Sequence, residues 1–100
     1  MVFGGGFVVS EVAEIFVGNK PVMNYVLAAM IQFSSGAETL VIKARGRAIA
    51  KAVTVAEVLR RRLFKEKVDV KDVKIGSEKV GEGENLRTVS TIEITLAKTE

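Results

Sequence analysis

The fold is decided in the stretch LVIKARGRAI, residues 40–49, where branched apolar residues give way to a basic segment and then to helical spacing. Residues 40–42 predict a buried strand that runs into the basic segment. After Gly46 the apolar residues return every three or four positions, which predicts an amphipathic helix. Its apolar stripe is expected to contain Ile49, Ala52, Val53, Ala56, Leu59 and Leu63. A strand therefore leads directly into a helix across a positively charged junction.

Another strand and helix are predicted before this junction. Residues 12–17 are rich in branched and aromatic side chains and end at Gly18, which predicts a strand. Pro21 suits the first turn of a helix, because its fixed φ fits there and its missing N–H would be unpaired anyway. Apolar residues at helical spacing continue to Phe33, and Gly36 is predicted to cap the C-terminal end of this helix.

Two strands joined by a turn are predicted after the second helix. Alternation over residues 68–75, with a one-residue slip at residues 71–72, predicts a bulged strand. Residues 81–85, GEGEN, predict a turn, and strict alternation over residues 91–96 predicts the last strand. The order βαβαββ indicates an α/β two-layer sandwich, in which two helices pack on a four-stranded mixed sheet. A long hairpin over about residues 73–94 joins its last two strands.

Length and composition narrow the class of protein. A chain of 100 residues has room for one domain, which we place at residues 11–100 after a flexible N-terminal segment at residues 1–10. Apolar residues make up 48% and charged residues 27%, which excludes a disordered chain. The chain has no cysteine and no histidine, so we expect no enzyme, no cofactor and no metal site. No apolar run reaches the roughly 20 residues of a membrane span, so we expect a cytoplasmic protein without a membrane partner.

The positive charge is concentrated in one quarter of the chain. The net charge is only +3, but residues 43–67 hold nine basic and two acidic side chains, a local charge of +7. This distribution predicts a basic patch rather than a uniformly basic surface. A solvated helix face would carry the same residues, so charge alone leaves both interpretations open.

The basic junction has features that suit phosphate. Residues 43–47, KARGR, lie where a strand ends and a helix begins, so free backbone N–H groups and the positive helix end lie beside guanidinium groups. Gly46 allows a close approach of the backbone. An ordinary helix N-terminus with exposed cations remains the alternative. Residues 60–62, three arginines, are expected in the last turn of the second helix, where cations complement the helix dipole.

Several short motifs occur in one order along the chain. They are GNKPVMNYV at residues 18–26, VIKARGRAI at 41–49, KAV at 51–53, IGS at 75–77 and VSTIEI at 89–94. Together they resemble the Alba family of small archaeal chromatin proteins, over about residues 11–98. The resemblance implies the βαβαββ fold, a homodimer, and double-stranded DNA as partner, with RNA also bound in the family.

The resemblance also implies a binding mode. The basic body of the dimer would lie across a DNA duplex, and its two hairpin arms would reach toward the minor groove. The residues expected to bind nucleic acid are Asn19, Lys20, Lys43, Arg45, Arg47 and Arg87. Four of these, here called the body cations, are Lys20, Lys43, Arg45 and Arg47. We expect them to converge on one anion-binding face that no carboxylate neutralises.

Two further expectations come from the resemblance. Acetylation of a loop lysine weakens binding in some members, which implies an acetyltransferase and a deacetylase as partners. Asn19 stands where the family usually has the first lysine of a pair, so Lys20 is the candidate for acetylation. A phenylalanine at contacts between dimers aligns with Leu63. Higher assemblies on DNA would therefore use Arg62, Leu63 and Phe64.

The expected function is that of a sequence-independent, double-stranded DNA-binding architectural protein of chromatin, associated with the chromosome. Nothing in the basic surface offers an obvious base-reading element, so phosphate contacts should dominate. Two alternatives stay open. One is an RNA-binding protein or a subunit of a ribonucleoprotein that uses the same surface, since A-form RNA presents 2′-hydroxyls in a shallow groove. The other is a structural oligomer that binds no nucleic acid.

Overall fold

The computed structural model describes residues 11–99, so the segment expected to be flexible, residues 1–10, lies outside the described residues. The main elements are β1 (Val12–Phe16), α1 (Val22–Ser34), β2 (Thr39–Arg45), α2 (Ala48–Val58), β3 (Val68–Val80) and β4 (Arg87–Lys98). A π-helical turn (Leu59–Leu63) extends α2, and a short 3₁₀ turn (Gly83–Asn85) lies between β3 and β4. This order confirms the predicted succession of strands and helices.

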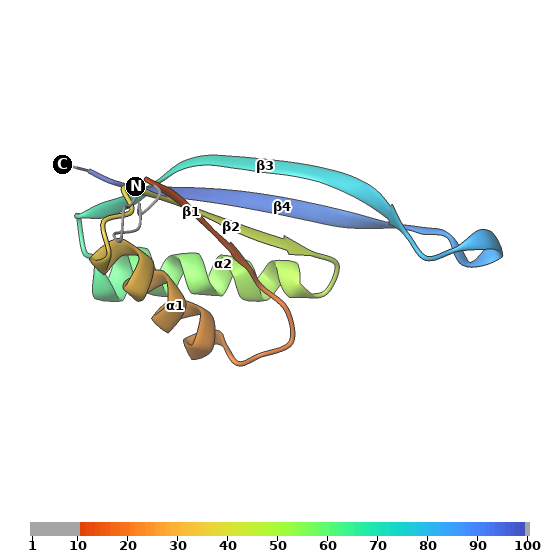
Figure 1. Ribbon diagram of the computed structural model, residues 1–100, viewed down its shortest axis with the longest axis horizontal. Helices are drawn as coiled ribbons and strands as arrows, with labels where there is room; N and C mark the ends of the chain where they lie inside the picture. The colour runs from red at the N-terminus through yellow and green to blue at the C-terminus, as the bar shows by residue number, and fades with distance from the viewer. Residues whose placement is uncertain (1–10, 100) are drawn as a thin grey trace, which may run out of the picture.

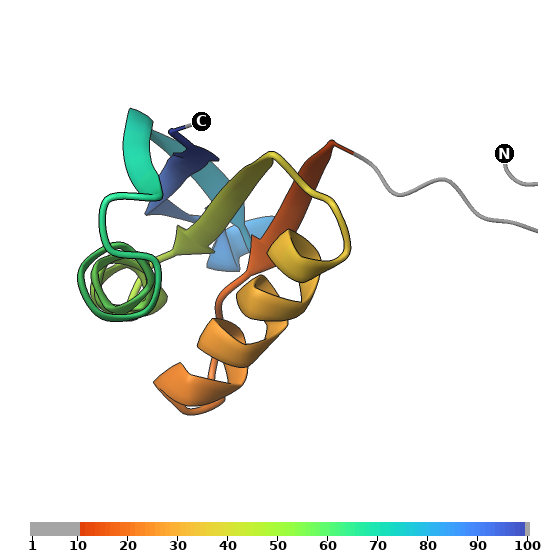
Figure 2. The same ribbon diagram turned by 90° about the vertical axis from the view of Figure 1, so that its left-hand side faces the viewer.

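The four strands form one mixed sheet in the order β1-β2-β4-β3. β1 is parallel to β2, and β4 lies antiparallel between β2 and β3. Both helices cover one face of this sheet and leave its other face free of helices (Figures 1 and 2). The predicted two-layer sandwich is therefore confirmed. Within residues 11–99, neither helix combines the length and the apolar character that crossing a bilayer requires.

The core lies between the helices and the covered face of the sheet. The largest side chains that are fully buried there are Leu40, Ile42, Leu59, Leu96, Val26, Val55 and Val68. They come from both helices and from the inward positions of β2, β3 and β4, because alternate strand residues face the helices. Burying each such side chain stabilises the fold by about 1.5–3 kcal/mol. The core thus fixes the sheet on which the loops at its end are built.

The apolar stripe predicted for the second helix is partly wrong. Ala52 and Leu59 are buried as expected, but Val53 and Leu63 are exposed. Leu63 leaves the stripe because the N–H of Phe64 bonds to the carbonyl of Leu59, 2.9 Å away, in a wider π-type turn. The ring of Phe64 packs on the core instead, edge-on to Phe33 with centroids 5.3 Å apart.

The ends of α1 agree with the sequence to within one residue. Pro21 is the N-cap rather than a residue of the first turn. At the other end Gly36 has a φ of 115°, and its N–H bonds to the carbonyl of Phe33. The N–H of Ala37 bonds to the carbonyl of Gln32 at 3.0 Å, which completes a Schellman motif. The predicted glycine cap is confirmed, because a side chain at this φ would be strained.

The hairpin of β3 and β4 projects beyond the rest of the molecule (Figure 1). The predicted bulge is present, between Val70 and Asp72. β2 pairs with β4 as far as Arg45 and Thr91, so residues 77–90 lie beyond the last strand pair of the body. The molecule is accordingly elongated, with extents of 47 × 35 × 23 Å. The turn is tight at Gly81, where a Cβ would lie 2.4 Å from a backbone oxygen.

Candidate nucleic-acid interface

Parallel pairing brings two loops to one end of the molecule. Phe16 at the end of β1 pairs with Lys43 near the end of β2, and the N–H of Val17 bonds to the carbonyl of Lys43 at 2.8 Å. The loop of residues 17–21 and the junction of residues 46–47 therefore lie at the same end, from which the hairpin also projects (Figure 1). The structure thus places the elements that carry the body cations at one end of the body.

The loop that carries Asn19 and Lys20 is held by its backbone. The hydroxyl of Tyr25, on α1, accepts hydrogen bonds from the N–H groups of Gly18 (2.9 Å) and Lys20 (3.0 Å). The ammonium of Lys51, on α2, donates to the carbonyls of Gly18 (3.1 Å) and Lys20 (2.6 Å). We call this arrangement the loop clamp. It leaves the side chains of Asn19 and Lys20 exposed while the backbone of Gly18 and Lys20 is tied to both helices.

The loop clamp also changes the acidity of Tyr25. Partial burial acts to raise the pKa of its hydroxyl, but the hydrogen bonds from the N–H groups of Lys20 and Gly18 act to lower it. The positive charges of Lys51 and Lys20 act in the same direction, and the pKa lies below its usual 10.0. The environment of this hydroxyl therefore favours negative charge on the oxygen that holds the loop.

Lys51 is a functional candidate that the sequence analysis missed. It is part of the KAV motif at residues 51–53, which contributed to the family resemblance without indicating a role. Its partners lie 31 and 33 residues away along the chain. Only the packing of α2 beside the loop shows that its ammonium binds backbone carbonyls rather than facing solvent on the outer face of the helix.

Lys43 and Arg45 point from the free face of the sheet, because they alternate with the buried Ile42 and Ala44. Each is paired with a carboxylate. The ammonium of Lys43 lies 3.1 Å from Glu14 on β1, and the guanidinium of Arg45 lies 2.6 Å from Glu78 on β3. The expectation of cations without carboxylate partners is therefore wrong for these two. Ion pairs as exposed as that of Arg45 contribute little free energy, so a phosphate can compete for the cation.

The other two body cations differ in this respect. Arg47 is the exposed N-cap of α2, and Gly46 before it has a φ of 57° with its N–H bonded to the carbonyl of Ser90 (2.9 Å). Among residues 11–99, no carboxylate lies within ion-pair distance of Lys20 or Arg47. No side-chain hydrogen bond caps the N-terminus of α2. This end of the helix, with its positive dipole, is open toward the same end of the molecule.

The basic quarter of the sequence does not form a single patch, which corrects the expectation from charge. The helix α2 separates its two groups of cations by about 16 Å, at a rise of about 1.5 Å per residue. At the far end, Arg60 and Arg61 bond the carboxylate of Glu57 at 3.0 and 2.6 Å. The hydrogen bonds from Arg61 and then Arg60 lower the pKa of Glu57. These arginines serve the helix end rather than the junction.

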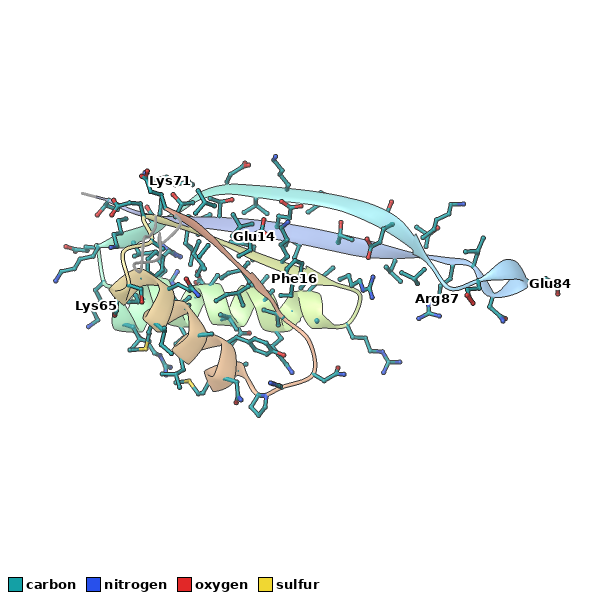
Figure 3. All side chains as sticks on the ribbon, viewed as in Figure 1. Glu14, Phe16, Lys65, Lys71, Glu84 and Arg87 are labelled. Atoms are coloured by element: carbon teal, nitrogen blue, oxygen red, sulfur yellow. The ribbon has the colours of Figure 1, made fainter. Side chains whose placement is uncertain are left out.

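The remaining predicted residues lie away from the junction. Arg87 opens β4 on the hairpin opposite Val80, near the tip that carries Glu84 (Figure 3). Arg62 and Leu63 are exposed in the π-helical turn at the far end of α2, and Phe64 packs within its own chain. The structure therefore places the elements that carry the body cations at one end of the molecule, with Lys43 and Arg45 on the free face of the sheet. It leaves Arg87 and the expected dimer–dimer contact away from that end.

Comparisons with known proteins show which family this chain is similar to. The family model described as Alba matches residues 13–77. The chain is 60% identical to DNA/RNA-binding protein Alba 1 of Archaeoglobus fulgidus, over 85% of this chain and 94% of that protein. It is 54% identical to DNA/RNA-binding protein Alba of Nanoarchaeum equitans, over 85% of this chain and 97% of that protein.

Solved structures show the same fold. The structure of Alba from Thermoplasma volcanium superposes with a TM-score of 0.79 at 43% identity, covering 84% of this chain and 98% of that one. The crystal structure of ALBA1 from Trypanosoma brucei superposes with a TM-score of 0.68, over 85% of this chain and 68% of that one. Its sequence identity of 24% makes this second likeness one of fold alone.

Proposed function

We propose, because the chain belongs to the Alba family, that it is a sequence-independent, double-stranded DNA-binding architectural protein that acts as a homodimer. One observation supports the proposal: the loop of residues 17–21, the end of β2 and the β2–α2 junction, which carry the body cations, lie at one end of the sheet. Relatives with 54–60% identity are named DNA/RNA-binding proteins, which supports nucleic acid as the partner. Residues 11–100 would form the binding domain.

The phosphate backbone is the proposed ligand of this end. Arginine guanidinium groups match phosphate geometry, and the open N-terminus of α2 adds a positive dipole beside Arg47. Lys43 and Arg45 would exchange Glu14 and Glu78 for phosphates, so the cations are kept in position before binding. Such contacts are the same for every base sequence, and sequence independence follows from them. Arg87 would add a contact from the hairpin arm near the minor groove.

Exposed apolar side chains support the homodimer. Val73 and Ile75 on β3 pair with Ile94 and Ile92, whose side chains lie on the helix-covered face. Ile75 is nonetheless 83% exposed, because β3 is the edge strand beyond the cover of the helices. Val53 on α2 is exposed as well. A second copy related by a two-fold axis would cover these side chains and place two hairpin arms on one assembly.

The salt dependence of DNA affinity tests the phosphate mechanism. If about five phosphates are neutralised, the logarithm of the affinity should fall with the logarithm of salt concentration with a slope of about −4 to −5. Arg45→Ala should weaken binding to two duplexes of unrelated sequence by the same factor and reduce the slope by about 1. Lys65→Ala, at an exposed lysine beyond the far end of α2, should leave the slope unchanged. A slope near zero, or a loss confined to one sequence, would overturn the proposal.

RNA is the second candidate partner, because the relatives above are named for both nucleic acids. Competition between DNA and RNA duplexes of matched sequence separates the two. Displacement of bound DNA by a lower concentration of RNA duplex would make RNA the principal partner.

A further inference from the structure

An aromatic side chain lies exposed among the body cations. Phe16, the last residue of β1, is 69% exposed and lies on the free face of the sheet with Glu14 (Figure 3). The ammonium of Lys43 is 5.5 Å from the centroid of its ring. A phosphate-binding surface does not need an aromatic ring, so the proposed duplex binding leaves Phe16 unexplained.

The ring borders a cavity that opens on the free face. The cavity has a volume of about 720 Å³, and its lining includes Phe16, Lys43, Arg45, Thr91 and the carboxylates of Glu78 and Glu93. Sites for small molecules in proteins are roughly 300–1,000 Å³. The lining therefore combines one aromatic ring, two cations, two carboxylates and the hydroxyl of Thr91 around a space of the size that a nucleotide needs.

A glycine on β3 leaves room for a hydroxyl group on the neighbouring strand. Gly76 pairs with Thr91, and a Cβ built on Gly76 would lie 3.2 Å from the hydroxyl oxygen of Thr91. A side chain at this position would crowd the hydroxyl. The hydroxyl of Thr91 is therefore accessible beside Arg45, its pairing partner on β2.

The chemistry of the lining selects an unpaired nucleotide. Bases within a duplex are stacked on both faces, whereas an unpaired base offers a free face to an aromatic side chain. We infer that the cavity binds an unpaired nucleotide of single-stranded RNA, with its base stacked on Phe16 and its phosphate at Lys43 and Arg45. The hydroxyl of Thr91 would meet the ribose 2′-hydroxyl. This inference rests on the proposed nucleic-acid function, because it uses two of the same cations.

Tryptophan fluorescence tests the stacking directly. The chain contains no tryptophan, so Phe16→Trp introduces a single reporter at the site. Saturation with a single-stranded oligouridylate should quench its emission strongly, whereas an RNA duplex of the same length, also at saturation, should not. Leu27→Trp is the matched control, because Leu27 is 57% exposed on α1 and lies outside the cavity. Its emission should be unchanged by either RNA.

Affinity measurements complete the test. Phe16→Ala should weaken oligouridylate binding about tenfold, which is within the range for one stacked base, and should change duplex DNA affinity less than twofold. Phe16→Tyr should retain the affinity, and Phe16→Leu, which keeps an apolar side chain without a ring face, should not. Because Phe16 is exposed, these variants should melt at the temperature of the parent protein.

The outcomes separate this inference from the function on which it rests. Binding of RNA without quenching, or equal quenching by the duplex, would overturn the base site while phosphate binding stands. Equal quenching by a matched single-stranded DNA would overturn the assignment to RNA. Failure of every nucleic acid to bind would overturn the proposed function itself.

Discussion

At the scale of single residues, the cations of the interface are matched to acidic neighbours within the chain. Arg45 on β2 bonds Glu78 on β3, and Lys43 bonds Glu14 on β1. These carboxylates occupy the guanidinium and ammonium donors that we assign to phosphate. Under the proposed function, Glu14 and Glu78 would act as internal competitors and would lower the affinity that the cations would have alone.

Glu78→Gln tests this competition. Removing the carboxylate should tighten binding to duplex DNA about twofold to fivefold, because an exposed ion pair contributes up to about 1 kcal/mol. Fluorescence anisotropy at constant salt measures the change. Glu82→Gln is the control, because it removes the same charge from the hairpin turn, where no ion pair involves Glu82 among the described residues. Equal tightening by both variants would show a general charge effect instead.

At the scale of elements, two helices hold one loop. Tyr25 of α1 binds its N–H groups and Lys51 of α2 binds its carbonyls, so the position of Lys20 depends on how both helices pack on the sheet. The loop needs no regular structure of its own for this. Such anchoring limits the conformational freedom that phosphate binding would otherwise have to remove.

The titration of Tyr25 reports on the loop clamp. It is the only tyrosine and the chain has no tryptophan, so ultraviolet absorbance follows it alone. The midpoint should lie below 10.0, and Lys51→Met should move it upward by removing a nearby positive charge. Because the pKa of Tyr25 is lowered in the folded state, ionisation of its hydroxyl stabilises the fold only at high pH. This contribution to the free energy of unfolding is absent at neutral pH. It grows as pH rises through the folded-state pKa and is fully present above 10.0.

Control variants make this titration decisive. Lys65→Met removes a lysine at the far end of α2 and should leave the midpoint where it is. A Tyr25 midpoint at 10.0 in the parent protein would show that the loop clamp does not form in solution. A midpoint that stays unchanged in Lys51→Met would show the same.

At the scale of the whole molecule, the shape is that of a compact body with one long arm (Figure 1). The arm is not itself basic, since Lys79 and Arg87 flank a turn that contains Glu82 and Glu84. Affinity for DNA would then come from the body, and the arm would set how the molecule sits on the duplex. Two bodies joined along β3 would double the number of phosphate contacts.

Ile75→Asp tests this assembly. A charge at the most exposed apolar position of β3 should convert the dimer to a monomer in analytical ultracentrifugation and reduce the salt slope of DNA binding by about half. Leu27→Asp, at an exposed apolar position of α1, should leave the dimer intact. The prediction is contradicted if Ile75→Asp remains dimeric while circular dichroism shows it folded, or if the parent protein is a monomer.

The sequence by itself determined the order of the elements and several of their details. The strand that ends in the basic junction, the glycine cap at Gly36 and the bulge after Val70 were all predicted correctly. Each depends on residues close together in the chain, because periodicity, glycine conformation and strand alternation are local properties. The same holds for the position of the body cations at strand and helix ends.

Only the tertiary structure decided which partners those residues have. It paired Arg45 with Glu78, placed Lys51 on the loop, and divided the basic quarter of the chain between the two ends of α2. Through one π-type turn, it also packed Phe64 against the core in place of the predicted Leu63. Strand register and helix packing bring together residues that are about 30 positions apart in the sequence. Local sequence patterns do not predict contacts between such distant positions. The chemistry of the end that we propose binds nucleic acid therefore depends on how the strands and helices pack.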